Sequence, residues 1–247
     1  MIVAEIYTVS DGKIAGFVIR GHSGGGSRGY NISCAEVSML SQSAYLGIRQ
    51  YLQREVSVAN HEHGGLGLEL KAAPDDVTEA IFQTMLIGLR EVMRVSPKAI
   101  KIRMIKMDKS AEENLQSKVN SMNPKPKKPL PNVDIESVKI RADIYRRDEK
   151  IIGFAFAELV SEIIDELKIY CAGTRILIRS VFSCFNDFLK RNVEFLERDN
   201  RFAMRLKTQA DDVSEAVFQT MLIGLREIEK QVPQVINVRE ISLGGET

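Results

Sequence analysis

With 247 residues, 44% of them hydrophobic, the chain is long enough for one large domain or two small domains with hydrophobic cores. A formal net charge of +1 gives no overall electrostatic reason to expect nucleic acid or an acidic surface as a partner. The apolar runs are shorter than the roughly 20 residues of a membrane span, and the N-terminus lacks the basic region of a signal peptide. The three cysteines have no paired spacing, which argues against a disulfide framework and against a zinc finger. We therefore expect a soluble, cytoplasmic protein.

The apolar pattern predicts secondary structure along the chain, beginning with a β-hairpin whose turn contains Asp11 and Gly12. The strands are grouped around the helices instead of alternating singly with them. The order ββαββαβ therefore predicts an α+β fold, with helices packed on a mostly antiparallel sheet. In the second helix, Asp76 and Glu79 have the spacing of a capping box. The predicted elements are strands at 2–9 and 13–20, a helix at about 34–53, strands at 56–62 and 66–72, a helix at about 76–95 and a strand at 99–106.

The chain contains an internal repeat. Residues 75–92 read DDVTEAIFQTMLIGLREV and residues 211–228 read DDVSEAVFQTMLIGLREI, with 15 of 18 positions identical. This similarity predicts two tandem ββαββαβ domains, which contact each other through the repeated helices as a pseudo-dimer. Four of the seven prolines fall between the copies and predict an extended linker. The expected boundaries are a first domain at 1–108, a Pro/Lys-rich linker at 109–134 and a second domain at 135–247.

The first copy has a glycine-rich segment that the second copy lacks. Five of the nine residues from 21 to 29 are glycine, and the segment begins with the pair Gly21-His22. The offset that pairs Cys34 with Cys171 places Leu159 opposite His22 and no glycine opposite these five. A loop needed only for folding is expected in both copies, so its loss favours a functional role in the first. Without the histidine, Cys171 is expected to be a small buried side chain.

Cys34 is the candidate nucleophile. Ser33 and Glu36 have the spacing of a capping box, which predicts that Cys34 lies in the first turn of its helix. At that end the unpaired backbone N–H groups and the helix dipole stabilise a thiolate, and they can receive a developing oxyanion. The glycine-rich loop is long enough to fold back and bring His22 to the thiol as a base. Ser38 lies one turn further on the same face, where its hydroxyl can bond the thiol or a substrate.

Three other interpretations have weaker support from the residues. A glycine-rich loop before a helix can bind phosphate, but this one lacks the Lys-Ser/Thr pair of a P-loop. His61 and His63 alternate along a strand and can chelate a metal with Cys34 or Glu62, but no second ligand cluster accompanies them. The Pro/Lys-rich linker can contact RNA or a ribosomal surface, although a solvated linker is the simpler account. We expect no metal or other cofactor, and no direct contact with nucleic acid or with a membrane.

With these residues assembled, the first copy resembles the Prp family of ribosomal-processing cysteine proteases. The family pattern is a Gly-His pair, a flexible glycine-containing loop, then Gly-x-Asp-x-Val-Cys-Ala and, shortly after, Ser. Gly21-His22, Gly29, Cys34-Ala35 and Ser38 match this pattern, and the resemblance covers about residues 1–106. The departures from the pattern are Asn31 for the aspartate, Ser33 for the valine and Glu36 for a small residue.

The resemblance implies that Cys34 is the nucleophile and His22 the general base of a cysteine endopeptidase. Such an enzyme removes the N-terminal extension of a large-subunit ribosomal protein. Family members are homodimers, so the chain is similar to a fused dimer whose second half is degenerate. Two other hypotheses stay open: an inactive module that binds a ribosomal protein or peptide in the groove beside the loop, and a purely structural pseudo-dimer. The residues implied in substrate binding and loop closure are Gly21, Ser23, Gly24, Gly25, Gly26, Gly29, Asn31 and Ser38.

Overall fold

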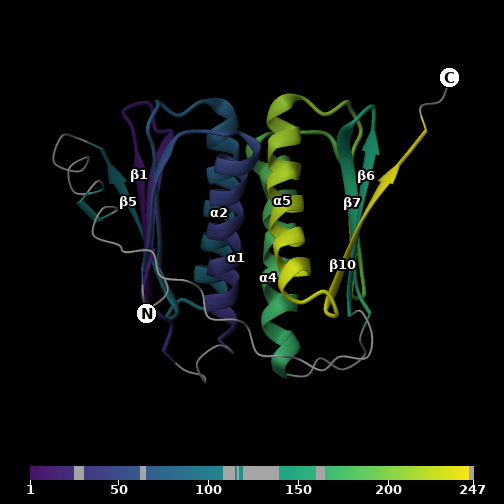
Figure 1. The fold of residues 1–247 in the computed structure, drawn as a ribbon, viewed down its shortest axis with the longest axis horizontal. Coiled ribbons are helices and arrows are strands. Elements are labelled where there is room, and N and C mark those ends of the chain that lie inside the picture. The colour runs from purple at the N-terminus through teal and green to yellow at the C-terminus, as the bar shows by residue number, and fades with distance from the viewer. Residues whose placement is uncertain are drawn as a thin grey trace.

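The chain folds into four layers, with a sheet on each outer side and the helices between the sheets (Figure 1). The computed structural model describes residues 1–24, 31–61, 65–107, 115, 117–118, 139–159 and 165–244. The first half contains β1 (Ile2–Thr8), β2 (Ile14–Arg20), α1 (Ile32–Leu46), the π-helix η1 (Gly47–Tyr51), β3 (Val56–His61), β4 (Gly65–Leu70), α2 (Asp76–Val95) and β5 (Ile100–Lys106). The second half contains β6 (Ile140–Arg147), β7 (Lys150–Glu158), α4 (Asp165–Ser183), the π-helix η2 (Cys184–Phe188), β8 (Val193–Arg198), β9 (Arg201–Leu206), α5 (Asp212–Gln231) and β10 (Ile236–Ser242).

Each half forms a five-stranded sheet that is mostly antiparallel. The first sheet has the order β3-β4-β2-β1-β5, and the second has the order β8-β9-β7-β6-β10. β5 runs parallel to β1, and β10 runs parallel to β6, because a helix crosses back over the sheet before each of these last strands. The first hairpin of each half carries the same register irregularity, directly after Tyr7 and directly after Tyr145. The predicted α+β fold, with helices packed on a mostly antiparallel sheet, is confirmed in both halves.

The helix predicted at about 34–53 starts earlier than expected and changes its hydrogen bonding in the last turn. The α-helix α1 ends at Leu46, and the π-helix η1 continues it. The second half does the same, with η2 following α4. Apolar spacing predicts a helical segment but does not distinguish i→i+4 from i→i+5 bonding, so this change was not predicted. The predicted strands agree with the structure to within two residues at each end.

The predicted capping box of Asp76 and Glu79 is wrong. The N-cap of α2 is Asp75, which forms a capping box with Thr78. Glu79 is buried and accepts the backbone N–H of Ile14, at the start of β2, at 2.6 Å. Two adjacent aspartates satisfy the capping pattern in two registers, so the sequence could not decide which of them caps the helix.

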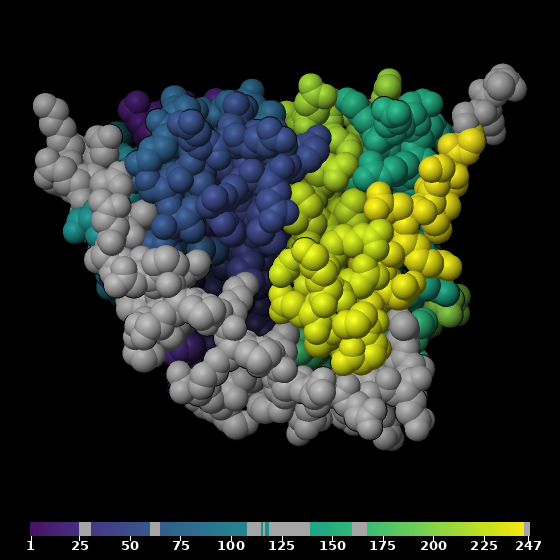
Figure 2. Space-filling view, viewed as in Figure 1, coloured from purple at the N-terminus to yellow at the C-terminus, as the bar shows by residue number. Residues whose placement is uncertain are grey.

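Glycine at one repeated position allows the helices of the two halves to approach closely. A Cβ at Gly88 of α2 would overlap the hydroxyl of Ser180 of α4, and a Cβ at Gly224 of α5 would overlap that of Ser43 of α1. These two contacts involve equivalent positions of the two copies. Helices α2 and α5 also contact each other, as predicted for the repeated segment. Figure 2 shows the surfaces of the two halves meeting along one seam.

The described part of the predicted linker packs on the outer face of the first sheet. Leu115 is fully buried in a cluster with Tyr7 and Val18, and Lys118 Nζ lies 2.8 Å from the buried carboxylate of Glu5. The Pro/Lys-rich stretch lies outside the described residues, so the domain boundaries stay a prediction. Within the described part of the chain, no helix has both the length and the apolar character needed to cross a bilayer.

Candidate active site

His22 follows β2 directly and is held in place by the start of the chain. Gly21 has a φ of +90°, and a Cβ at this position would lie 2.8 Å from the carbonyl oxygen of Met1. This turn therefore requires glycine. The Met1 ammonium group donates a hydrogen bond to the carbonyl oxygen of His22 at 2.5 Å. The backbone of His22 is thus fixed at the end of the sheet, while the residue itself is exposed.

Cys34 lies in the first turn of α1 as predicted, but the predicted cap is wrong. The N-cap is Asn31, whose Oδ1 accepts the N–H of Cys34 at 3.0 Å, whereas Ser33 and Glu36 lie inside the helix. The signal for this cap was in the sequence, because asparagine is among the strongest N-cap residues. The N–H groups of Cys34 and Ala35 both donate to Asn31. These two amides are therefore not free to receive an oxyanion, and that expectation can apply only to the first two amides of the helix.

A thiol, an imidazole and a hydroxyl converge at the start of α1. Cys34 Sγ lies 3.9 Å from His22 Nδ1 and 3.3 Å from Ser23 Oγ. Ser23 is buried, and its hydroxyl donates to Asn31 Oδ1 at 2.5 Å, which leaves its lone pairs to accept from the thiol. Sequence reasoning placed Ser23 in the loop but missed this contact, since the contact depends on how the intervening loop folds.

This arrangement can activate the thiol. The contact between Nδ1 and Sγ allows the imidazole of His22 to accept the thiol proton, and the imidazolium then stabilises the thiolate. The N-terminal end of α1 favours the same negative charge. Cys34 is partly exposed, so a carbonyl carbon can reach the sulfur.

Of the remaining predicted site residues, the structure describes Gly24 and Ser38. Gly24 is exposed, with open space where a Cβ would lie. Ser38 is exposed one turn after Cys34 on α1 and lines a cavity. The other glycines predicted in the loop, namely Gly25, Gly26 and Gly29, lie outside the described residues.

The histidines weighed as metal ligands are not brought into a described cluster. His61 ends β3, while Glu62 and His63 lie outside the described residues. Across the residues that the structure describes, no group of three His, Cys, Asp or Glu side chains is arranged to hold a metal ion.

Cys171, the equivalent cysteine of the second half, has a different environment. Helix α4 already includes Asp165, so Cys171 lies within the helix and not in its first turn. Burial, together with the nearby carboxylate of Glu158, raises the pKa of Cys171 to about 12. This thiol stays protonated at neutral pH. The prediction that Cys171 is a small buried side chain is confirmed.

Glu36 lies two residues after Cys34, on the other side of α1, where it lines a cavity with residues of α2 and α4. Burial, with a contribution from the nearby carboxylate of Glu91, raises the pKa of Glu36 to about 7. Its charge is therefore partly lost at neutral pH. The negative field that an ionised Glu36 would impose on the Cys34 thiolate is correspondingly weaker.

The first part of the chain is similar to known proteins. Residues 1–101 match the family model of the cysteine protease Prp. The essential ribosomal processing protease Prp from S. aureus, solved with a covalently linked product peptide, is 24% identical with a TM-score of 0.39, covering 42% of this chain and 99% of that one. The S. aureus protease solved with a substrate peptide is 22% identical with a TM-score of 0.37, and the match covers 42% of this chain and 99% of that chain. A protein from Streptococcus mutans is 25% identical with a TM-score of 0.39, and the match covers 43% of this chain and 96% of that chain. No curated protein matches the chain.

The match to the Prp cysteine protease family applies to residues 1–101, which are less than half of the chain.

Proposed function

We propose that the chain is a cysteine endopeptidase whose active site lies in its first half. The observation that carries this proposal is the distance of 3.9 Å between Cys34 Sγ and His22 Nδ1. The buried hydroxyl of Ser23, 3.3 Å from the same sulfur, supports it. A thiol with a base in contact, at the start of a helix and open to solvent, has the minimum set of groups for nucleophilic attack on a peptide carbonyl.

Each half-reaction uses the same two residues. His22 takes the proton of Cys34, and the thiolate attacks the carbonyl carbon of the scissile peptide bond. The imidazolium returns its proton to the leaving amine as the C–N bond breaks, which leaves a thioester on Cys34. His22 then takes a proton from water, and the hydroxide attacks the thioester. The C–S bond breaks and releases the carboxyl group of the product, and the imidazolium returns its proton to the sulfur, which regenerates the thiol. During the thiolate stages, Ser23 can rotate its hydroxyl from Asn31 to the sulfur and donate there.

The substrate that we propose is the N-terminal extension of a large-subunit ribosomal protein, removed in the cytoplasm. The support comes from the family resemblance at Gly21-His22 and Cys34-Ala35, together with the match over residues 1–101. The second half is then the degenerate member of a fused dimer, joined through a linker at about 109–134. Its buried Cys171 supports this assignment.

Cleavage of a ribosomal protein that carries its N-terminal extension tests the proposal. We expect the full chain to release the extension at one peptide bond, detected by mass spectrometry. Cys34→Ala should abolish the product, and His22→Ala should lower its rate by about 100-fold or more. Cys171→Ala is the matched control and should cleave normally. Full cleavage by the Cys34→Ala chain would sink the proposal.

A second candidate function is binding without cleavage, in the groove beside the glycine-rich loop. The observation that favours it is Asn31, an amide at the position where the family pattern has aspartate, because an amide supplies no negative charge to an imidazolium. If the extended ribosomal protein binds the wild-type chain and Cys34→Ser equally and no product forms, this candidate replaces the protease.

A further inference from the structure

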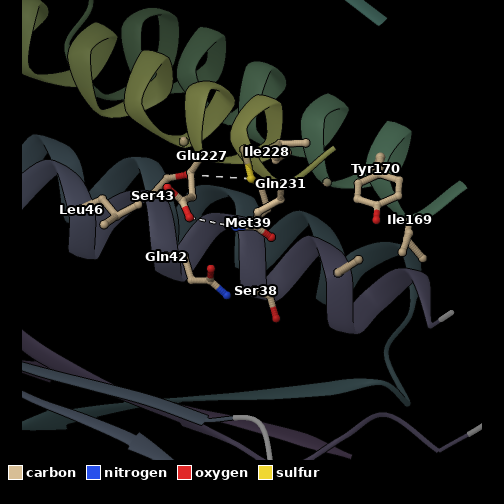
Figure 3. A pocket seen from close by; sticks show the side chains of 13 residues that line it. Ser38, Met39, Gln42, Ser43, Leu46, Ile169, Tyr170, Glu227, Ile228 and Gln231 are labelled. Atoms are coloured by element: carbon tan, nitrogen blue, oxygen red, sulfur yellow. Dashed lines mark hydrogen bonds between the residues drawn. The ribbon is translucent and has the colours of Figure 1, made fainter. Parts of the chain in front are cut away.

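Two cavities occupy equivalent places between the halves. One, of about 150 Å³, lies between α1, α4 and α5 (Figure 3). The other, of about 300 Å³, lies between α1, α2 and α4. Most of their lining residues correspond to each other in the two copies. The matched pairs include Ala35 with Ala172, Ser38 with Arg175, Met39 with Ile176, Gln42 with Arg179, Gly173 with Glu36, Glu227 with Glu91, and Gln231 with Val95.

The two cavities have diverged in chemistry although their positions match. The cavity on the Cys34 side has neutral Ser38 and Gln42 where its counterpart has Arg175 and Arg179. It also has Gly173, with no side chain, where its counterpart has the carboxyl group of Glu36. The remaining walls on the Cys34 side are mainly apolar. The apolar lining residues there are Ala35, Met39, Leu46, Ile169 and Ile228.

The cavity on the Cys34 side begins one helical turn from the candidate nucleophile. Ser38 follows Cys34 by four residues and Gln42 follows it by eight, so the three residues lie on one face of α1. Each is about one turn, or about 5 Å along the helix axis, from the next. An extended peptide advances about 3.3 Å per residue. A peptide whose scissile carbonyl is at Cys34 and which runs along this face therefore brings a side chain two or three residues away to the cavity.

We infer that this cavity is a specificity pocket for one large apolar side chain of the peptide substrate, and that the second half of the chain supplies its far wall. The inference rests on the proposed function in the first half. Figure 3 shows Glu227, Ile228 and Gln231 of α5 facing α1 across the cavity, with Ile169 and Tyr170 of α4 nearby. The degenerate half thus keeps a role in substrate selection after losing its own thiol site.

The size and lining of the cavity define its occupant. An apolar cavity of about 150 Å³ is large enough to hold a benzene molecule, so a phenylalanine or leucine side chain fits this one. The carboxyl group of Glu227 also lines this cavity, and its Oε1 accepts a hydrogen bond from Gln231 Nε2 at 2.9 Å. Polar groups at Ser38 and Gln42 line the same cavity and can bond the backbone of a bound peptide.

A matched pair of variants tests the pocket. Gln231 and Val95 are equivalent, each ends its helix, and both are exposed, so tryptophan at either position should leave the fold intact. Gln231→Trp narrows the cavity on the Cys34 side, and Val95→Trp narrows only its counterpart. The probes are dye-labelled alanine-rich decapeptides in which one phenylalanine is moved along the sequence, with the phenylalanine-free peptide as reference. Binding is measured by fluorescence anisotropy on the full chain carrying Cys34→Ser, which removes turnover from the readout.

We expect phenylalanine at one position to strengthen binding over the reference by about tenfold. Gln231→Trp should remove this gain while leaving the reference peptide unchanged, and Val95→Trp should preserve it. Absence of any position-dependent gain, or equal loss in both variants, would overturn the inference. If the gain and its selective loss are seen but the Cys34 chain cleaves nothing, the pocket stands and the proposed protease function fails. If the chain cleaves the ribosomal protein but Gln231→Trp has no effect on peptide binding, the proposed protease function stands and the pocket fails.

Discussion

Glu79 Oε2 accepts the backbone N–H of Ile14 at 2.6 Å, which ties α2 to the start of β2. The other oxygen of Glu79 accepts from Gln83 Nε2 at 2.7 Å. The second half repeats both bonds at equivalent positions. The glutamate and glutamine of the repeated segment therefore join a helix to its own sheet and do not cap the helix. Their identity in both copies follows from this shared contact.

Removing the Glu79 carboxylate should destabilise the fold. Glu79→Ala leaves the buried N–H of Ile14 without its acceptor, and we expect a loss of about 2–3 kcal/mol in the free energy of unfolding, measured with urea. Glu79→Gln retains an acceptor oxygen and should lose less. Asp76→Ala is the control, because this exposed side chain was predicted to cap the helix and does not. A larger loss for Asp76→Ala than for Glu79→Ala would contradict the assignment.

The sequence was sufficient to predict the elements and their order. Apolar periodicity predicts where strands and helices form, and the internal repeat supplies a second, independent copy of the pattern. The nearness of His22 to Cys34 was also predicted, from a glycine-rich loop of suitable length. These features depend on local spacing along the chain, which the sequence displays directly.

The sequence could not predict contacts that depend on three-dimensional placement. The hydroxyl of Ser23 reaches the sulfur of Cys34 only because Asn31 holds both the start of α1 and the serine. The cavity at Ser38 needs the second half to form its far side. Neither relation has a fixed spacing in sequence, so no pattern indicates it.

Gly88 should not tolerate even a methyl group. In an ordinary helix interior, replacing glycine with alanine stabilises the helix by about 1 kcal/mol. A Cβ at Gly88 would instead overlap the hydroxyl of Ser180 and the side chain of Leu40, so Gly88→Ala should lower the free energy of unfolding by about 1–3 kcal/mol. Gly173→Ala is the matched control, since the nearest atom to its Cβ would be 3.4 Å away.

The double variant Gly88→Ala with Ser180→Gly checks the cause of that loss. Removing the Ser180 hydroxyl should recover part of the stability, seen as a positive coupling between the two changes in a double-mutant cycle. Additive losses would show that the overlap with Ser180 is not responsible.

Cys34 should be the one thiol that iodoacetamide labels in the folded chain at neutral pH. Burial raises the pKa of Cys171 to about 12 and that of Cys184 to about 12, whereas Cys34 is partly exposed beside His22. We expect one label per chain by mass spectrometry. His22→Ala should slow the reaction, and Ser23→Ala should slow it by about 2–10-fold, the worth of one hydrogen bond. Labelling of Cys171 at a comparable rate would contradict the site.

Glu36 should make the fold less stable as the pH rises. Its pKa is about 7 in the folded chain, mainly because of burial, against an ordinary value of 4.5. Between these two values the folded state keeps a proton that the unfolded state has released, so stability falls as the pH increases through this window. Below it the carboxyl is protonated in both states, and above it the full cost of the buried charge is present.

Glu36→Gln isolates this effect, because the amide does not titrate. The variant should match the wild-type chain near pH 4 and become more stable than it as the pH rises to about 7, by about 1 kcal/mol once partial exposure is allowed for. Glu91 faces Glu36 from α2, and Lys168, Arg175 and Arg179 line the same cavity from α4. Urea unfolding of both chains across this range measures the difference. A difference that stays constant from pH 4 to pH 8 would show that Glu36 keeps its ordinary pKa and that the cavity leaves its carboxylate hydrated.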